Sequence, residues 1–399
     1  MQHSRIGTLA AVAALALFAA MPLAADEAET KGGISIESED GEFSFSLGGR
    51  IHFDAYAFDE DVVSTTGTTD FRRARLTLSG ELYGWGYKLE QDFSSGTTTA
   101  GFRDVYISKK AAGGTFTIGQ FKPYRSMEEL TSSNEITMME RPFASASGIY
   151  SGRQFVQGLG YKKGGDQYSF GVAVYNTRSA GDSRNEGVGA TGRVTFAPVA
   201  SDSGVFHVGL SYSTENANDG TPDGEIGVNY AGRRGPSLDI AVRPGDSGDT
   251  IDTAGLELAG RAGPIYVQGE YATATVGQGP GLSDQDVDTY YVMASWMLTG
   301  ESKPYDAKSG VFKSAKPEND YGAWELTARY DFIENKDVDN LEATMTTVGV
   351  NYYVNPKVRF MLNWSMGDAT FAEVDEETGI VTIVNDEPDQ IALRTQLSF

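Results

Sequence analysis

The sequence predicts an all-β protein that crosses a membrane as a transmembrane antiparallel β-barrel of about 16 strands, with one long loop folded inside as a constriction. Three observations lead to this prediction. The chain begins with an export signal, many short segments alternate apolar and polar residues with a period of two, and no apolar stretch after the signal reaches the roughly 18 residues that a spanning helix needs.

Composition narrows the possible functions before any motif is considered. The 399 residues include 48 Gly, 20 Tyr and 20 Phe, which suits a β protein with many turns. The absence of Cys excludes a disulfide scaffold and a zinc ribbon, and three His argue against a His-rich metal site. The formal charge of -23 argues against a nucleic-acid partner, which requires a basic face. We therefore expect no cofactor, no metal and no nucleic acid.

The first 25 residues have the pattern of a secretory signal peptide. Arg5 precedes an apolar stretch from Leu9 to Met21, and Ala24 and Ala25 lie at a plausible cleavage point. An N-terminal membrane anchor is the alternative, but the apolar run is short for a span. We expect residues 26–44 to be a short periplasmic segment and residues 45–399 to be the barrel.

The alternation of residue types decides how the mature chain meets the membrane. Segment 322–334 has an apolar face formed by Trp324, Leu326, Ala328, Tyr330 and Phe332. Its other face is formed by Glu325, Thr327, Arg329 and Asp331. A face that carries charges on strand after strand cannot be a dry core, because unpaired buried charges are very costly. The polar faces must therefore enclose water and the apolar faces must contact lipid.

Sixteen segments fit this pattern, an even number as expected for a bacterial barrel. They are residues 45–58, 70–82, 86–95, 102–110, 115–121, 153–163, 168–177, 187–197, 204–214, 251–262, 264–276, 287–299, 321–334, 343–354, 357–368 and 389–399. Residues 225–243 are interpreted as loop because of their Gly, Pro and Arg content. Turns at 83–86, 164–166 and 355–357 are short, whereas 122–152, 215–250 and 369–388 are long, as expected for the two rims of an outer-membrane barrel.

Several motifs, taken in order, resemble the phosphate-selective porin O/P family. They are Gly49–Asp54 (GRIHFD), Asp70–Leu76 (DFRRARL), Gly119–Tyr124 (GQFKPY), Glu128–Ser133 (EELTSS), Gly322–Tyr330 (GAWELTARY) and Asn355-Pro356. The final strand also ends in Phe399, which resembles the signal that outer-membrane barrels present to their assembly machinery. The resemblance covers most of residues 45–399. It implies a homotrimeric porin in the outer membrane of a Gram-negative bacterium, passing phosphate, polyphosphate or other small inorganic anions.

Candidate pore-lining residues are cationic, because anion passage needs positive charges along the path and Arg offers a fixed fork of donors. By alternation Arg50, Arg73 and Arg75 point into the lumen, whereas Arg72 points away or lies at the rim. The remaining candidates lie in or beside the expected constriction loop, or in the later Gly/Pro-rich segment. They are Lys122, Arg125, Arg141, Arg153, Arg233, Arg234 and Arg243. The alternative for each is a wall arginine paired with a nearby acid such as Asp54, Glu90 or Asp92.

The acidic balance leaves a second interpretation open. Acidic runs such as residues 59–61 and 373–377 fall in expected loops, and an acidic mouth repels anions within a Debye length of about 8 Å. These loops could bind divalent ions that bridge to lipopolysaccharide, or the pore could be a general or cation-preferring one.

An enzyme is disfavoured, because His52 and Asp54 could pair but no nucleophile can be placed beside them. Segment 26–44 is too short for the helical domain of a cell-wall anchor. We therefore expect a passive channel and not an enzyme, with membrane lipid and lipopolysaccharide as its surroundings.

Overall fold

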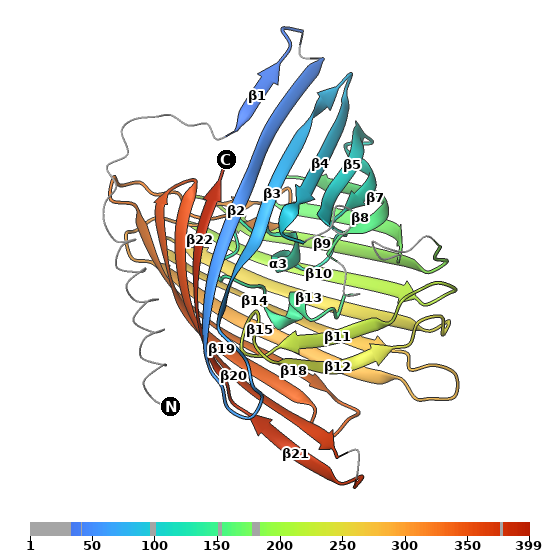
Figure 1. Cartoon of the computed structure of the whole chain (residues 1–399). Coiled ribbons are helices and arrows are strands. Elements are labelled where there is room, and N and C mark those ends of the chain that lie inside the picture. Colours follow the sequence, from blue (N-terminus) through green and yellow to red (C-terminus); the bar gives the residue numbers. More distant parts are fainter. Residues whose placement is uncertain (1–32, 41, 96–100, 151–153, 178–183, 376–377) are drawn as a thin grey trace.

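The structure, a computed structural model, describes residues 33–399 except 41, 96–100, 151–153, 178–183 and 376–377 (Figure 1). The expected signal peptide and the first part of segment 26–44 lie outside these residues. Within the described part of the chain, no helix has both the length and the apolar character needed to cross a membrane. The helical elements of these residues are α3 (Met127–Leu130), α4 (Phe143–Ala146) and a 3-10 turn at Phe93–Ser95.

In the described residues, sixteen antiparallel strands form one closed wall, because the last strand pairs with the first long one. The wall strands are β2 (Phe43–Asp59), β3 (Thr68–Leu82), β4 (Trp85–Asp92), β5 (Phe102–Ala111), β6 (Gly114–Phe121), β7 (Val156–Gly164), β8 (Tyr168–Asn176), β9 (Val188–Ala200), β10 (Gly204–Asn216), β13 (Thr250–Ala262), β14 (Ile265–Val276), β15 (Gln285–Met297), β18 (Ala323–Asn335), β19 (Glu342–Asn355), β20 (Val358–Val374) and β22 (Asp389–Ser398). Each predicted strand is present with its ends shifted by a few residues, so the predicted barrel is confirmed.

Six shorter strands of the described residues lie outside the closed wall. β1 (Ile34–Glu37) adds to the end of β2, and β21 (Val381–Asp386) adds to β20. The pair β11 (Gly224–Asn229) and β12 (Ser237–Arg243) forms a separate hairpin, as does the pair β16 (Tyr305–Asp306) and β17 (Val311–Phe312). The prediction that residues 225–243 are loop is therefore wrong. Most of the Gly, Pro and Arg residues that suggested a loop fall in the hairpin turn at residues 230–236, where Gly232 and Arg234 have positive φ.

The two faces of the wall separate apolar from charged residues as the alternation predicted. At the middle of β10 and β13, Leu210 lies opposite Leu256 and is 54% exposed on the outer surface. The next residue of β10 is Ser211 and the next residue of β13 is Glu257, and both are buried on the inner side. The outer face is thus apolar enough to contact lipid, while the inner face carries the ionisable groups.

Three segments fold into the barrel and divide its lumen. The constriction loop (residues 122–150), which contains α3 and α4, reaches the opposite wall, where Glu270 of β14 accepts hydrogen bonds from the N–H groups of Met127 and Glu128 at 3.0 and 2.9 Å. Figure 1 shows α3 within the curve of the sheet. The outer hairpin (residues 217–249) buries Ile226 and Ile240 in the apolar cluster that also contains Ile333 of the wall.

The third inward segment, the inner strap (residues 298–322), enters from the rim that carries the short turns and was not predicted. Arg193 donates to the carbonyls of Ser309 and Gly310 at 2.9 and 2.7 Å. His207 Nδ1 lies 2.7 Å from the hydroxyl of Tyr305. The alternation ends at residue 299 and resumes at residue 321, and nothing in the intervening sequence distinguishes a segment inside the barrel from a long external turn.

Replacing Leu210 with Arg tests the assignment of the outer face. The change places a charge near the middle of a lipid-facing strand, so we expect the free energy of unfolding to fall by about 2–4 kcal/mol. Urea unfolding of the protein in lipid vesicles measures the loss. Leu282→Arg, at an exposed position of the 277–284 loop, is the control and should change stability little. Equal effects of the two changes contradict a lipid-facing position for Leu210.

Candidate permeation path

Four cavities follow one another along the lumen, each sharing lining residues with the next. The inner vestibule (about 570 Å³) shares Arg50 with a narrower cavity of about 150 Å³. That cavity shares Arg141 and Gln154 with a second narrow one of about 200 Å³, which in turn shares Ala146 and Gly148 with an outer chamber of about 620 Å³. We call the two narrow cavities together the throat. The constriction loop lines every section, so it sets the width of this path.

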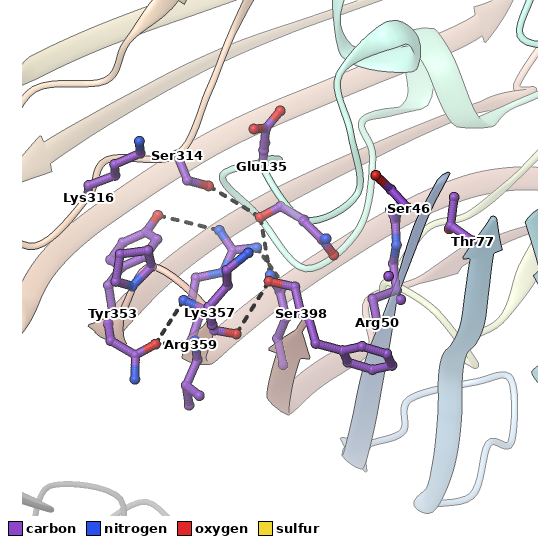
Figure 2. A pocket seen from close by; sticks show the side chains of 18 of the residues that line it. Ser46, Arg50, Thr77, Glu135, Ser314, Lys316, Tyr353, Lys357, Arg359 and Ser398 are labelled. Carbon is purple, nitrogen blue, oxygen red and sulfur yellow. Dashed lines mark hydrogen bonds between the residues drawn. The ribbon is translucent and has the colours of Figure 1, made fainter. Parts of the chain in front are cut away.

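The inner vestibule opens at the rim with short turns and is surrounded by positive charge. Figure 2 shows Lys316, Lys357 and Arg359 on one side of the cavity and Arg50 on the other, with Glu135 above them on the constriction loop. Among the described residues, the Arg, Lys, Asp and Glu side chains that line the vestibule are these four cations and Glu135. Burial raises the pKa of the Glu135 carboxyl above its ordinary value.

Cations also outnumber acids in the throat. Among the described residues, seven cationic side chains line it: Arg50, Arg72, Arg75, Lys88, Lys122, Arg125 and Arg141. The four acidic ones are Glu90, Asp104, Glu129 and Glu140. By formal charge, the narrowest stretch therefore has an excess of three positive groups, in a chain whose formal charge is -23. The acidic residues that dominate the composition lie elsewhere.

Several predicted site residues are wall arginines with acid partners. Arg50 lies 3.2 Å from Glu90, and Arg75 lies 3.0 Å from Glu90 and 2.8 Å from Asp92. Arg125 pairs with Glu129 at 3.2 Å and also donates to the carbonyl oxygen of Tyr150. Carboxylates within 4 Å offset much of the charge of these residues, so a passing anion gains less from them.

Lys122 and Arg141 differ, because neither has a carboxylate within ion-pair distance among the described residues. Lys122 Nζ donates to the carbonyl of Glu129 at 2.5 Å and reaches that of Thr131 at 3.4 Å. Arg141 donates to the same Thr131 carbonyl at 2.7 Å. Burial and the neighbouring Arg141 lower the pKa of Lys122. An anion between the two cations favours the charged lysine, so the pair is suited to a negative ligand.

The other predicted residues lie away from the throat. Arg73 is almost fully buried and lines none of these cavities, and its hydrogen-bond partner among the described residues is His52 Nδ1 at 3.4 Å. Arg233 and Arg234 both pair with Asp70 on β3, at 3.0 and 2.8 Å. One further residue of the set lines the outer chamber, Arg243, which donates to the carbonyl of Pro222 at 3.0 Å. The last member, Arg153, lies outside the described residues.

The expectation that Arg72 points away from the lumen or lies at the rim is wrong, because Arg72 lines the throat. The pairing of β2 with β3 shifts at His52, so that Arg73 lies opposite His52 whereas Phe71 lies opposite Phe53. Arg72 is thus an extra residue in a β-bulge, and a bulge re-aims side chains that simple alternation would send outward. Its guanidinium contacts Glu140 of the constriction loop at 2.7 Å.

Sequence reasoning also missed other cations of the path. Lys88, Lys316, Lys357 and Arg359 line the throat or the vestibule. Arg394 of β22 is fully buried and contacts both Asp54 and Glu140. Alternation within the predicted strands could have placed Lys88, Arg359 and Arg394 on the inner face. No local pattern could have placed Lys316, because it belongs to the inner strap.

A closed 16-stranded barrel with a charged path through it is the architecture of an outer-membrane porin. Solved structures share this fold across most of the chain. An anion-selective porin from Comamonas acidovorans aligns with a TM-score of 0.59 at 14% identity, covering 90% of this chain and 100% of its own. OmpT, an outer membrane protein of Vibrio cholerae, aligns with a TM-score of 0.59 at 11% identity, covering 92% of this chain and 99% of its own.

The chain belongs to the phosphate-selective porin O and P family, whose model matches residues 45–399. Porin O of Pseudomonas aeruginosa is 30% identical over 412 residues, covering 93% of this chain and 91% of that protein. The family resemblance noted in the sequence is thereby confirmed. Family and fold together make the protein a porin of the Gram-negative outer membrane.

The raised pKa of Glu135 predicts how pH changes the vestibule. At neutral pH the carboxylate opposes the nearby cations, and it is protonated before ordinary carboxyl groups as the pH falls toward about 4. We expect Glu135→Gln to increase anion selectivity at pH 7 and to have little effect at pH 4. Reversal potentials in a KCl gradient across planar bilayers measure both. A difference that persists unchanged at pH 4 contradicts this role for Glu135.

Proposed function

We propose that the protein passes phosphate-like anions, phosphate or polyphosphate, by passive diffusion. One observation carries the proposal: the throat holds seven cationic and four acidic side chains among the described residues, although the whole chain is strongly acidic. Selectivity in a pore is decided where the solute loses most of its hydration, which is the narrowest part. The family description, phosphate-selective porin, agrees in the sign of the charge.

Lys122 and Arg141 are the proposed central anion site. Their donors converge near the Thr131 carbonyl, and no carboxylate among the described residues pairs with either. The hydroxyl-bearing Ser132 and Ser133 line the same narrow cavity and can donate to phosphate oxygens. Arg50 lies between this site and the vestibule, 2.9 Å from the hydroxyl of Ser133, so an anion leaving the site meets another cation along the path.

The outer chamber supports the alternative of a general or cation-preferring pore. Its ionisable side chains among the described residues are Arg243 and four acids, Glu215, Asp223, Glu225 and Asp239. Such a chamber concentrates cations and repels anions at low ionic strength. We favour anion passage, because the chamber is wide, at about 620 Å³, and its field is screened more than that of the narrow throat.

The surroundings of the channel follow from its surface. The apolar outer face is suited to membrane lipid, and the acidic loops are suited to divalent cations that bridge to lipopolysaccharide. A homotrimer is proposed by analogy, since one fold neighbour, OmpT of Vibrio cholerae, was solved in a trimer form.

We favour a channel over an enzyme because of the surroundings of His52. This side chain contacts Asn134 at 3.0 Å and Arg73 at 3.4 Å. Neither partner is a nucleophile or an acid that would make His52 a general base.

The ion selectivity of the unmodified protein separates the two functions. With purified protein in planar bilayers and a tenfold KCl gradient, we expect a reversal potential close to the chloride equilibrium value. Adding inorganic phosphate should then reduce the chloride current in a saturable manner, because phosphate occupies the same site. A reversal potential on the potassium side supports the cation-preferring alternative.

Neutralising the central site should weaken phosphate binding. We expect Lys122→Gln and Arg141→Gln each to raise the phosphate concentration that half-blocks the chloride current by about 10- to 100-fold, since a hydrogen bond to a charged group contributes about 1.5–3 kcal/mol. Lys110→Gln removes the same charge from an exposed position at the inner rim, where Lys110 pairs weakly with Glu81 at 3.5 Å, and should leave the block unchanged. Equal effects at all three positions point to net charge rather than a site.

A further inference from the structure

We propose that Glu140 is a built-in counter-ion: its carboxylate occupies an anion site formed by Arg72 and Arg394, and its charge limits how tightly the throat holds a permeating anion. The inference rests on the proposed function and adds a residue that determines affinity. It assigns a role to an acid of the constriction loop, whereas the pore-lining candidates chosen from the sequence were all cationic.

The geometry around Glu140 is that of anion recognition by arginine. Arg72 presents two parallel donors, with Nε at 2.7 Å from Oε1 and Nη2 at 2.8 Å from Oε2. Arg394 Nη2 donates to Oε1 at 2.7 Å. A fork of two N–H donors matches the oxygens of a phosphate as well as those of a carboxylate. Without the Glu140 side chain, these donors would form a ready anion site.

Of the two arginines, Arg72 depends on Glu140 for neutralisation. Arg394 also holds Asp54 through two contacts, at 2.7 and 2.6 Å. Arg72, in contrast, has Glu140 as its acid partner, and no second carboxylate lies within 4 Å of it among the described residues. Removing the Glu140 charge therefore releases about one positive charge, and most of that gain falls on Arg72.

The pair faces the permeation path. Arg72 and Glu140 line the throat cavity of about 200 Å³, the one next to the outer chamber, together with Arg125 and Arg141. Their side chains are 20% and 23% exposed, whereas Arg394 behind them is fully buried. An anion in the throat can therefore reach the Arg72 guanidinium, and it meets the Glu140 carboxylate there.

The constriction loop does not need this carboxylate as an anchor. Asn363 Oδ1 accepts from the N–H of Met139 at 2.9 Å, and Arg329 donates to the carbonyl of Glu140 at 2.8 Å. Arg394 also donates to the carbonyl of Met139. These three contacts hold the backbone on both sides of residue 140 and remain when the side chain loses its charge. The main effect of the Glu140 carboxylate is therefore on the charge of the throat, and not on the position of the constriction loop.

A channel gains from such a counter-ion because throughput requires release as well as binding. A throat in which both Arg72 and Arg141 lacked a carboxylate partner would bind a multivalent phosphate tightly and release it slowly. Burial opposes the charged form of Glu140, but the Coulombic attraction of Arg72 and Arg394 outweighs it and lowers the pKa of this carboxyl. The counter-ion therefore stays ionised through the ordinary pH range.

Glu140→Gln tests the proposal, since the amide keeps the shape and loses the charge. In planar bilayers with symmetrical KCl, we expect inorganic phosphate to half-block the chloride current at a concentration about tenfold lower than in the unmodified channel. In a KCl gradient, the reversal potential should also move further toward the chloride value. Glu140→Asp, which keeps the charge, should stay close to the unmodified channel in both measurements.

Glu257→Gln is the matched control. Arg193 holds this buried carboxylate with a similar fork, at 2.7 and 2.6 Å, but Glu257 lines neither the throat nor the vestibule. We expect no change in phosphate block or reversal potential. Arg72→Gln in the E140Q background should bring the phosphate affinity back to within about twofold of the unmodified channel. If E140Q does not fold, Arg72→Gln alone tests the proposal from the opposite side. It leaves the Glu140 charge unbalanced, so we expect weaker phosphate block and lower chloride selectivity.

Each failure has its own signature. Unchanged or weaker phosphate block in a folded E140Q channel overturns the counter-ion role. Fluctuating currents with lost selectivity identify Glu140 as an anchor of the constriction loop and also overturn it. If the unmodified channel prefers potassium, the proposed function fails, and a reversal potential that does not shift in E140Q then overturns this inference separately.

Discussion

The structure depends on one constraint, which is that no backbone N–H or C=O group facing hydrocarbon can remain without a hydrogen-bond partner. The pairing of β2 with β22 satisfies this constraint by closing the sheet, so the wall has no free edge within the barrel. Closure gives every strand a lipid side and a lumen side. The apolar residues of the alternation then face lipid, and the ionisable residues are concentrated in a lumen whose width depends on the segments folded into it.

The protein is acidic overall but its path is basic, because the acids and the cations are distributed differently along the barrel. Glu90 and Asp92 are used in pairs with Arg50 and Arg75, whereas many other acids lie in the loops of the outer rim. Along the axis, the charge changes from an acidic outer chamber to a basic throat and a basic inner vestibule. Net charge is thus a poor guide to selectivity. Ions lose hydration water in the narrow stretch, and the charges there decide which ions are compensated for that loss.

The lumen cations form two groups with different consequences. Those paired with acids, such as Arg75 with Asp92 at 2.8 Å, stabilise the wall and contribute a reduced field. Those bound to backbone carbonyls, such as Lys122 and Arg141, keep their charge available to a solute. Glu140 lies between the groups, since it is an acid supplied by the loop rather than by the wall. Moving a counter-ion onto the constriction loop allows affinity to be adjusted without changing the barrel.

The sequence by itself determined the fold class, the strands of the wall and the inner face of most of them, because a period-two pattern specifies which side of a sheet each residue occupies. It also indicated Lys122, Arg125 and Arg141 as candidates, through the unusual length of their loop. Tertiary structure alone decided which cations pair with acids, why the bulge turns Arg72 inward against Glu140, and that the inner strap and outer hairpin enter the barrel. These outcomes depend on contacts between residues far apart in the chain, and such contacts leave no periodic signal in the sequence.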